Sequence, residues 1–154
     1  MARKGVGDTY GAGAAEIDRW IENIRSLPEM VNAAAPAVGE MLLAEFQRTA
    51  NAGTTPEGEP WPPTKKGNKP LAGAAAALQL VVSGNVIIIK ITDHHVFHQF
   101  AAGVPARRML PSGGLPDRLG NAIRLGMVDM GVEWMTRGGS HAKSGGAKMK
   151  PGGG

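Results

Sequence analysis

Residues 78–92 have the sequence LQLVVSGNVIIIKIT, in which two β-branched runs flank a Gly-Asn pair. Apolar runs of this length bounded by turn residues are typical of β-strands. A two-residue connection with glycine in first place suits a type II′ turn. We therefore expect a β-hairpin in which strand 78–83 is joined through Gly84 and Asn85 to strand 86–92.

The two faces of the second strand differ in polarity. Side chains alternate along a strand, so Ile87, Ile89 and Ile91 share an apolar face, whereas the opposite face includes Lys90. This pattern indicates a sheet with helices on one face. A short third strand could run from His95 to Phe100.

Helical periodicity surrounds the hairpin. Apolar residues recur at spacings of three and four before Pro28, namely Ile17, Trp20, Ile21, Ile24 and Leu27. A second helix is expected from about Glu29 to Ala50, which either kinks or begins at Pro36. A third runs from about Asp117 to Met135. Its apolar stripe consists of Leu119, Ile123, Met127, Met130 and Trp134.

These elements predict an α+β fold, with a small antiparallel sheet (the hairpin plus a short third strand) packed by two or three amphipathic helices. The length of 154 residues fits one domain. We expect an N-terminal arm over residues 1–13, a single domain over 14–136 and a basic Gly/Lys-rich tail over 137–154. Residues 51–70 are dense in glycine and proline and predict a long loop.

The positive charge is concentrated at the C-terminus. The chain carries a net charge of +4, and residues 1–136 balance at thirteen basic against thirteen acidic residues. The excess comes from Arg137, Lys143, Lys148 and Lys150. Any attraction to DNA or to an acidic partner is therefore expected from the tail rather than from the domain.

The compartment is expected to be the cytosol. No window is long and apolar enough to span a membrane, and the basic N-terminus is not followed by an apolar stretch of the kind that signal peptides carry. The chain has no cysteine, so disulfides and thiolate metal sites are excluded.

Three histidines, His94, His95 and His98, lie within five residues. If the segment is a strand, His94 and His98 share one face and His95 points away. The pair lacks the intervening glutamate of the H-E-x-x-H zinc motif. We expect surface or interface imidazoles, with a metal-dependent hydrolase as a more distant alternative.

Other enzymatic patterns are missing from the sequence. No serine stands in a G-x-S-x-G elbow, and no glycine-rich segment has the phosphate-binding pattern that ends in Gly-Lys. The sequence therefore predicts a protein that is not an enzyme and has no cofactor.

Two loops carry residues with open interpretations. Trp61 stands among prolines and could be an exposed anchor or could fold back onto the core. Arg107 and Arg108 could meet a carboxylate on a neighbouring molecule or could simply be solvated.

Three short motifs occur in a fixed order along the chain. They are Gly58-Glu59-Pro60-Trp61-Pro62-Pro63, then His98-Gln99-Phe100 with Gly103 after it, then Pro105-Ala106-Arg107-Arg108-Met109-Leu110. In this order the chain resembles the virion-morphogenesis or tail-completion proteins of long-tailed bacteriophages over roughly residues 30–135. It departs from that family's pattern at Ala72, at the inserted Ala101-Ala102 and at Met109.

The resemblance implies a structural protein of the phage neck. Such a protein would form a ring, expected to be a hexamer, between a head-side connector or stopper and the tail terminator or tail tube protein, with an axial channel for DNA. The interface residues it suggests are Trp61, Pro62, His98, Gln99, Phe100, Arg107 and Arg108. The basic tail could touch DNA without sequence preference.

Two alternatives remain at this stage. The chain could be a tail terminator or a minor capsid or connector protein, which is the same class of molecule. It could also be a small DNA-binding module that acts through the basic tail.

Overall fold

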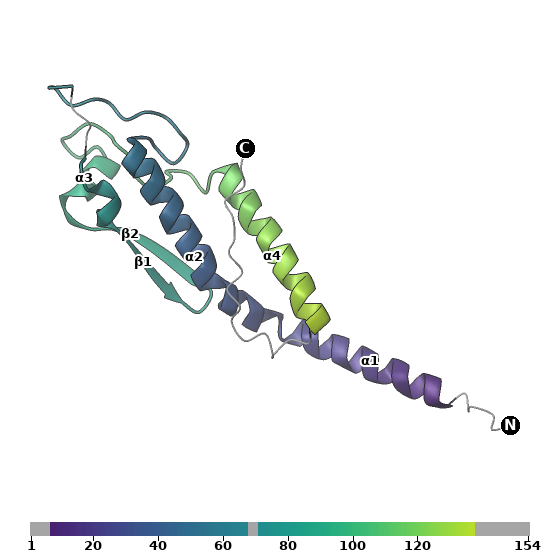
Figure 1. Ribbon diagram of the computed structural model, residues 1–154. Coiled ribbons are helices and arrows are strands. Elements are labelled where there is room, and N and C mark those ends of the chain that lie inside the picture. The colour runs from purple at the N-terminus through teal and green to yellow at the C-terminus, as the bar shows by residue number, and fades with distance from the viewer. Residues whose placement is uncertain (1–6, 68–70, 138–154) are drawn as a thin grey trace.

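The computed structural model describes residues 7–67 and 71–137, with side chains from Gly13 onward. Its main elements are the helices α1 (Gly7–Arg25), α2 (Leu27–Ala52), α3 (Val96–Gln99) and α4 (Asp117–Arg137) and the strands β1 (Leu78–Ser83) and β2 (Val86–Ile91). This confirms the α+β class with a small antiparallel sheet (Figure 1). Within the described ranges, no helix has the length and apolarity needed to cross a membrane.

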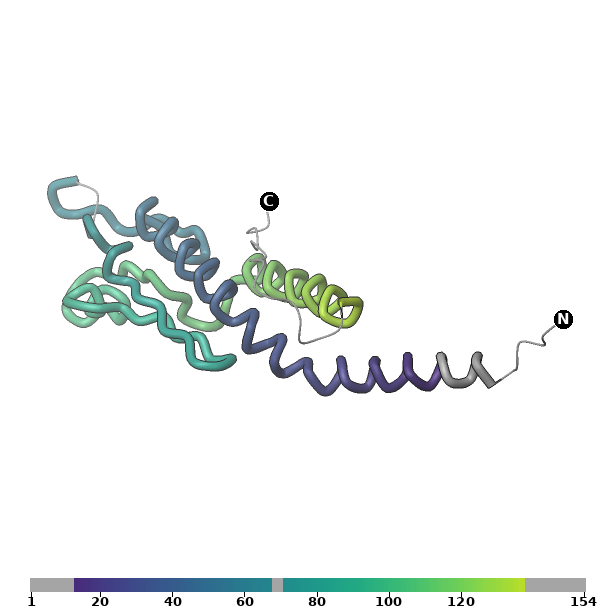
Figure 2. The backbone as a smooth tube through the Cα atoms, turned by 60° about the horizontal axis from the view of Figure 1, so that its bottom comes forward, coloured from purple at the N-terminus to yellow at the C-terminus, as the bar shows by residue number. Residues whose placement is uncertain are grey.

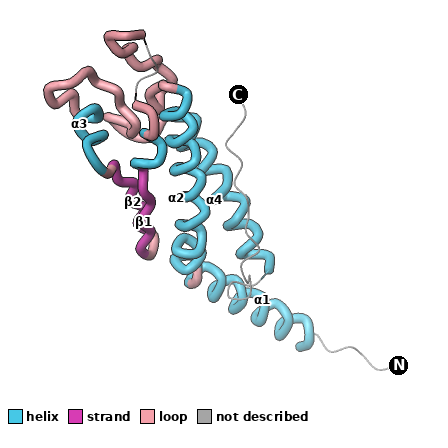
Figure 3. Tube along the Cα trace, turned by 60° about the vertical axis from the view of Figure 1, so that its left-hand side comes forward, coloured by secondary structure: helices cyan, strands magenta, loops and turns pink. Residues whose placement is uncertain are grey.

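Helix α2 is the central element of the fold. The hairpin packs on one side of it and α4 on the other (Figures 1 and 3). The helix runs through Pro36 rather than beginning there. It ends at Gly53, whose φ of 77° allows the left-handed cap that few other residues adopt.

The hairpin has the expected connection and faces. Ser83 pairs with Val86 across the turn, and Leu78 pairs with Ile91 at the open end. The face that carries Leu80 and Ile89 turns toward α2. Gly39 of α2 lets the backbone of the helix come close to this face, because a Cβ atom there would lie 2.9 Å from a methyl carbon of Leu80.

The expected third strand from His95 to Phe100 is wrong. The segment forms a 3₁₀ turn, Asp93–His95, followed by the short helix α3. Asp93 has a φ of +66°, so the chain leaves the extended conformation directly after β2. Within the described residues the sheet therefore has two strands.

Two expected boundaries also move. Helix α1 begins at Gly7, so the second half of the predicted arm is helical. Arg137 belongs to the last turn of α4, where it lies 2.7 Å from Glu133 in an i,i+4 ion pair, rather than to the tail. Residues 1–6 and 138–154 lie outside the described part of the chain.

Helix α4 is attached at both of its ends, to α2 near its start and to the junction of α1 and α2 near its end. Near its start, Arg118 pairs with the buried carboxylate of Glu45, which Arg48 also binds at 2.7 Å. Near its end, the indole N–H of Trp134 donates to the hydroxyl of Ser26 at 2.8 Å. The side chains of Leu119 and Ile123 add apolar contacts to the core around Phe46.

Candidate functional site

The three motif segments meet at one end of the molecule. Trp61–Pro63, His98–Gln99 and Arg107–Leu110 are joined by hydrogen bonds into what we call the loop cluster. Figure 3 shows the loops gathered beside α3 and the C-terminal end of α2. The three motifs, which are separated in the sequence, therefore lie together in the fold.

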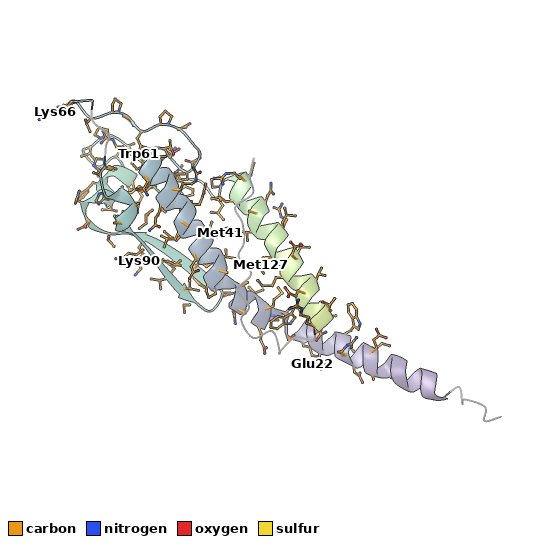
Figure 4. The ribbon with its side chains drawn as sticks, in the orientation of Figure 1. Glu22, Met41, Trp61, Lys66, Lys90 and Met127 are labelled. Atoms are coloured by element: carbon orange, nitrogen blue, oxygen red, sulfur yellow. The ribbon has the colours of Figure 1, made fainter. Side chains whose placement is uncertain are left out.

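Trp61 is positioned by a loop that folds back on the end of α2. Thr54 forms a β-bridge with Pro60, and the main-chain N–H of Trp61 donates to the carbonyl oxygen of Gly53 at 2.8 Å. The indole is 5% exposed, and its N–H donates to the carbonyl oxygen of Arg108 at 3.0 Å. Figure 4 shows Trp61 beside the C-terminal end of α2.

Arg107 links its own loop to the loop that carries Trp61 and to the segment that carries His98. Its side chain is 6% exposed and donates to the carbonyl oxygens of Pro62 at 3.0 Å and Pro63 at 3.3 Å. Its main-chain N–H donates to the carbonyl oxygen of His98 at 3.0 Å. Proline cannot donate a main-chain hydrogen bond, but its carbonyl oxygen can accept one. Here two proline carbonyl oxygens accept hydrogen bonds from the buried guanidinium.

His98 is held between the same loops. Its Nδ1 lies 3.1 Å from the carbonyl oxygen of Pro105, which fits the tautomer that carries a proton on Nδ1. Arg107 Nη1 approaches the same nitrogen at 3.5 Å, and in this tautomer that approach is a contact between two donors rather than a hydrogen bond.

Gln99 fixes the loop Arg107–Leu110 through both the oxygen and the nitrogen of its side-chain amide. Its Oε1 accepts the main-chain N–H groups of Met109 at 2.8 Å and Leu110 at 3.0 Å. Its Nε2 donates to the carbonyl oxygen of Leu110 at 2.9 Å. Three main-chain groups of a loop that belongs to no helix or strand are thereby satisfied by one side chain.

The structure resolves the alternatives that the sequence left open for these side chains. Trp61 folds back onto the core, and Arg107 is neither solvated nor free to meet a neighbour's carboxylate. Arg108 lies 3.9 Å from both Glu57 and Glu59 of its own chain. Trp61 and Arg107 therefore support the predicted interface from inside and do not form its surface.

The surface of the loop cluster is made by other side chains. Phe100 is 74% exposed, and Phe97, which the sequence motifs did not single out, is 52% exposed. Phe100 also lines an apolar pocket of about 470 Å³ together with Ile91, Val96, Gln99, Leu110, Pro111 and Ser112. The interface role of Pro62, His98, Gln99 and Phe100 stays a prediction.

The histidines do not have the geometry of a strand. His94 and His95 stack with ring centroids 4.3 Å apart, and His98 lies on α3. His95 is buried with an Nδ1 that has no hydrogen-bond partner. Burial lowers the pKa of His95, and the nearby His94 lowers that pKa further. Over residues 7–67 and 71–137, no three His, Asp or Glu side chains are grouped to hold a metal ion.

The residues proposed for DNA contact are mostly outside the described ranges. Arg137 is ion-paired on α4. Lys143, Lys148 and Lys150 lie beyond residue 137, so the role of the basic tail stays a prediction.

The described part of the chain leaves two apolar helix faces uncovered. One, the α1 stripe, consists of Ile17, Trp20, Ile21 and Ile24, all at least 40% exposed. The other, the α4 outer stripe, consists of Leu125, Val128 and Val132, all at least 56% exposed. The α1 stripe is visible in the sequence as a helical pattern, whereas the α4 outer stripe was not among the predicted apolar faces.

Comparison with protein-family models, curated proteins and solved structures finds no match for this chain.

Proposed function

We propose that this chain is a structural subunit of a tailed-phage neck that joins or completes the tail at the head–tail junction as part of a ring. The observation that carries the proposal is the uncovered apolar surface of α1 and α4. Monomeric soluble proteins rarely leave contiguous apolar patches of more than a few hundred Å² exposed. A chain that exposes seven large apolar side chains on two helix faces is suited to assembly.

The loop cluster supports a second role in the same assembly. Its loops are fixed by hydrogen bonds from Trp61, Gln99 and Arg107, so their surface has a defined shape before a partner arrives. Rigid surfaces lose little conformational entropy on binding. We assign this surface, which includes the exposed Phe97 and Phe100, to the head-side connector or stopper, or to the tail terminator or tail tube protein.

The three motifs also support the proposal through their location. They carry the resemblance to tail-completion proteins, and in this fold they build one structural unit rather than three separate loops. A tail terminator or a minor capsid or connector protein would use the same features. In each case the basic residues of the tail would contact DNA in the channel in a salt-sensitive way.

The experiment is a gene deletion followed by complementation in vitro. We expect a lysate of the deletion phage to contain DNA-filled heads and finished tails that are not joined. Adding the purified chain should restore joined particles and plaque formation. A Phe97→Asp/Phe100→Asp variant should fail to restore them, whereas the exposed control Lys65→Asp/Lys66→Asp should succeed. Infectious particles in the deletion lysate itself would refute the proposal.

A further inference from the structure

Helix α1 makes little use of its apolar face within its own chain. It leads away from the hairpin and from α4 (Figures 1 and 2). Of its described side chains only Asn23 is buried, where its Nδ2 donates to the carbonyl oxygen of Met135 at 3.0 Å. Helices in proteins gain most of their stability from packing an amphipathic face, so this face requires a partner.

Helix α4 is apolar on two opposite sides. Its inner stripe, with Leu119 and Ile123, packs toward α2. At 3.6 residues per turn, the α4 outer stripe lies about half a turn away around the helix from the inner one. A stripe of large apolar side chains on a helix marks a face that packs against another element, so the outer stripe also requires a partner.

The two uncovered faces match in spacing. Ile17, Trp20 and Ile24 follow the pattern i, i+3, i+7, and Leu125, Val128 and Val132 follow the same pattern. Each therefore spans two helical turns, or about 10 Å. The α1 stripe has bulky side chains and the α4 outer stripe has mainly valines, a combination that lets large residues pack between small ones.

These faces cannot cover each other within one chain. The contact between α1 and α4 is confined to their junction near Asn23 and Met135, and beyond it the helices diverge (Figures 1 and 3). The residues outside the described ranges offer only Met1, Val6 and Met149 as large apolar side chains. A second molecule is thus needed to cover either face.

We propose that the α1 stripe of one copy packs against the α4 outer stripe of the next copy. The inference rests on the proposed ring only in taking a second copy of this chain as the partner. Pairing α1 with α1 would leave the α4 outer stripe exposed, whereas this contact covers both faces. Because the two surfaces differ, the contact is head-to-tail and repeats from copy to copy until a ring closes.

The area is sufficient for such a contact. The seven side chains of the two stripes expose on the order of 700 Å² of apolar surface, about the apolar share of an interface of about 1,200 Å², the lower limit of the standard size. With the polar residues that flank the stripes, one α1–α4 contact reaches the lower range of stable interfaces.

Cross-linking tests the contact directly, because the full chain has no cysteine of its own. Single-cysteine chains Ile21→Cys and Val128→Cys are mixed and treated with a short thiol-specific cross-linker. These positions are central in each stripe, so they come close in either relative direction of the helices. We expect the mixture to give several-fold more dimer than either chain alone. The matched control Ala15→Cys, on the opposite side of α1, should give no such excess with Val128→Cys.

Sedimentation of paired variants gives a second measurement. Ile17→Asp/Ile24→Asp and Leu125→Asp/Val132→Asp should each remain monomeric, since each lacks one of the two faces. Mixed together they should form dimers and nothing larger, because one intact α1–α4 contact remains. Ala15→Asp/Arg19→Gln lowers the net charge by the same two units away from the stripe and should associate as the unaltered chain does.

Several results would overturn the contact. One is that Ile21→Cys alone gives as much cross-linked dimer as the mixture. Another is that the Leu125→Asp/Val132→Asp chain associates by itself. A third is that the unaltered chain stays monomeric at high concentration. The proposed contact and the proposed function can be refuted independently of each other. A cross-linked α1–α4 pair in a phage whose deletion lysate is infectious would keep the contact and remove the neck assignment.

Discussion

The indole N–H of Trp61 donates a hydrogen bond to the main-chain carbonyl oxygen of Arg108, across 3.0 Å and 47 positions of sequence. The bond joins the proline-rich loop after α2 to the loop before α4. Arg107 joins the same two loops in the opposite direction, from the second loop to the carbonyl oxygens of Pro62 and Pro63. The two residues together hold loops that have no strand or helix to fix them.

Trp61→Phe should lower the free energy of unfolding by about 1–2 kcal/mol, because the carbonyl oxygen of Arg108 loses its buried donor while most of the apolar contact remains. Denaturant unfolding measures the change. The same substitution at the half-exposed Trp20 is the control and should change stability by less than about 0.5 kcal/mol. Equal effects at the two positions would contradict the role of the Trp61 hydrogen bond.

Gln99→Glu should destabilise the fold by about 1–3 kcal/mol at neutral pH. A carboxylate can still accept from Met109 and Leu110, but it cannot donate to the carbonyl oxygen of Leu110 and places negative charge against it. Gln79→Glu, on the exposed face of β1, is the matched control and should be nearly neutral. Thermal unfolding of the two variants compares them, and a stable Gln99→Glu chain would show that the amide is not needed.

Glu45 should make stability depend on pH in the acid range. Hydrogen bonds from Arg48 and then from Arg118 lower the pKa of Glu45 from 4.5 to about 2, against the effect of burial. The unfolded chain keeps the ordinary pKa and binds the proton first, so this stabilisation is full above about pH 4.5 and is lost as the pH falls toward 2.

Glu45→Gln should remove that dependence and cost about 1–2 kcal/mol at neutral pH, because both arginines keep an acceptor but lose the charge. Glu40→Gln, on the exposed side of α2, is the control. Unfolding measured from about pH 6 to pH 2.5 should give a shallower slope for Glu45→Gln alone. Parallel curves for all three chains would contradict the assignment.

His95 should weaken the fold at a higher pH than Glu45 does. Burial and the neighbouring His94 lower its pKa below 6.5. The unfolded chain therefore takes up the proton first as the pH falls below 6.5, and stability that is full above this value declines from there. The orphaned Nδ1 adds a cost at every pH.

A His95→Phe chain should lose less stability than the unaltered chain between about pH 7.5 and pH 5.5. Thermal unfolding at a series of pH values measures the difference. His94→Phe should flatten the profile less than His95→Phe does, because it removes only the second of the two causes that lower the pKa of His95 and leaves its burial in place. Identical pH profiles for His95→Phe and the unaltered chain would show that His95 does not titrate in a buried state.

The hairpin, the long helices and the fold class could be predicted because each depends on local pattern. Val86–Ile91 alternates in burial as expected, and Gly84 has a positive φ as the turn requires. The third strand was mispredicted because β-branched and aromatic residues near His95 suggested extension. The positive φ of Asp93, a residue type that adopts this conformation more readily than most, ends the strand first.

The site could be predicted only in part, for a similar reason. The motifs identified Trp61, Gln99 and Arg107, but not that their side chains face inward, since a buried arginine needs carbonyl acceptors from a loop 44 residues or more away. The α1 stripe was correctly predicted to be the apolar face of a helix. Its exposure could not be inferred, because periodicity indicates which side of a helix is apolar and not what covers it.

The most direct test of the neck assignment is a cryo-electron microscopy reconstruction of the intact virion around the head–tail junction. We expect a ring at the junction whose subunits fit the α2 helix, the hairpin and α4, with α1 of each subunit on α4 of the next. A junction fully accounted for by other proteins, with this chain absent from the particle, would contradict the account.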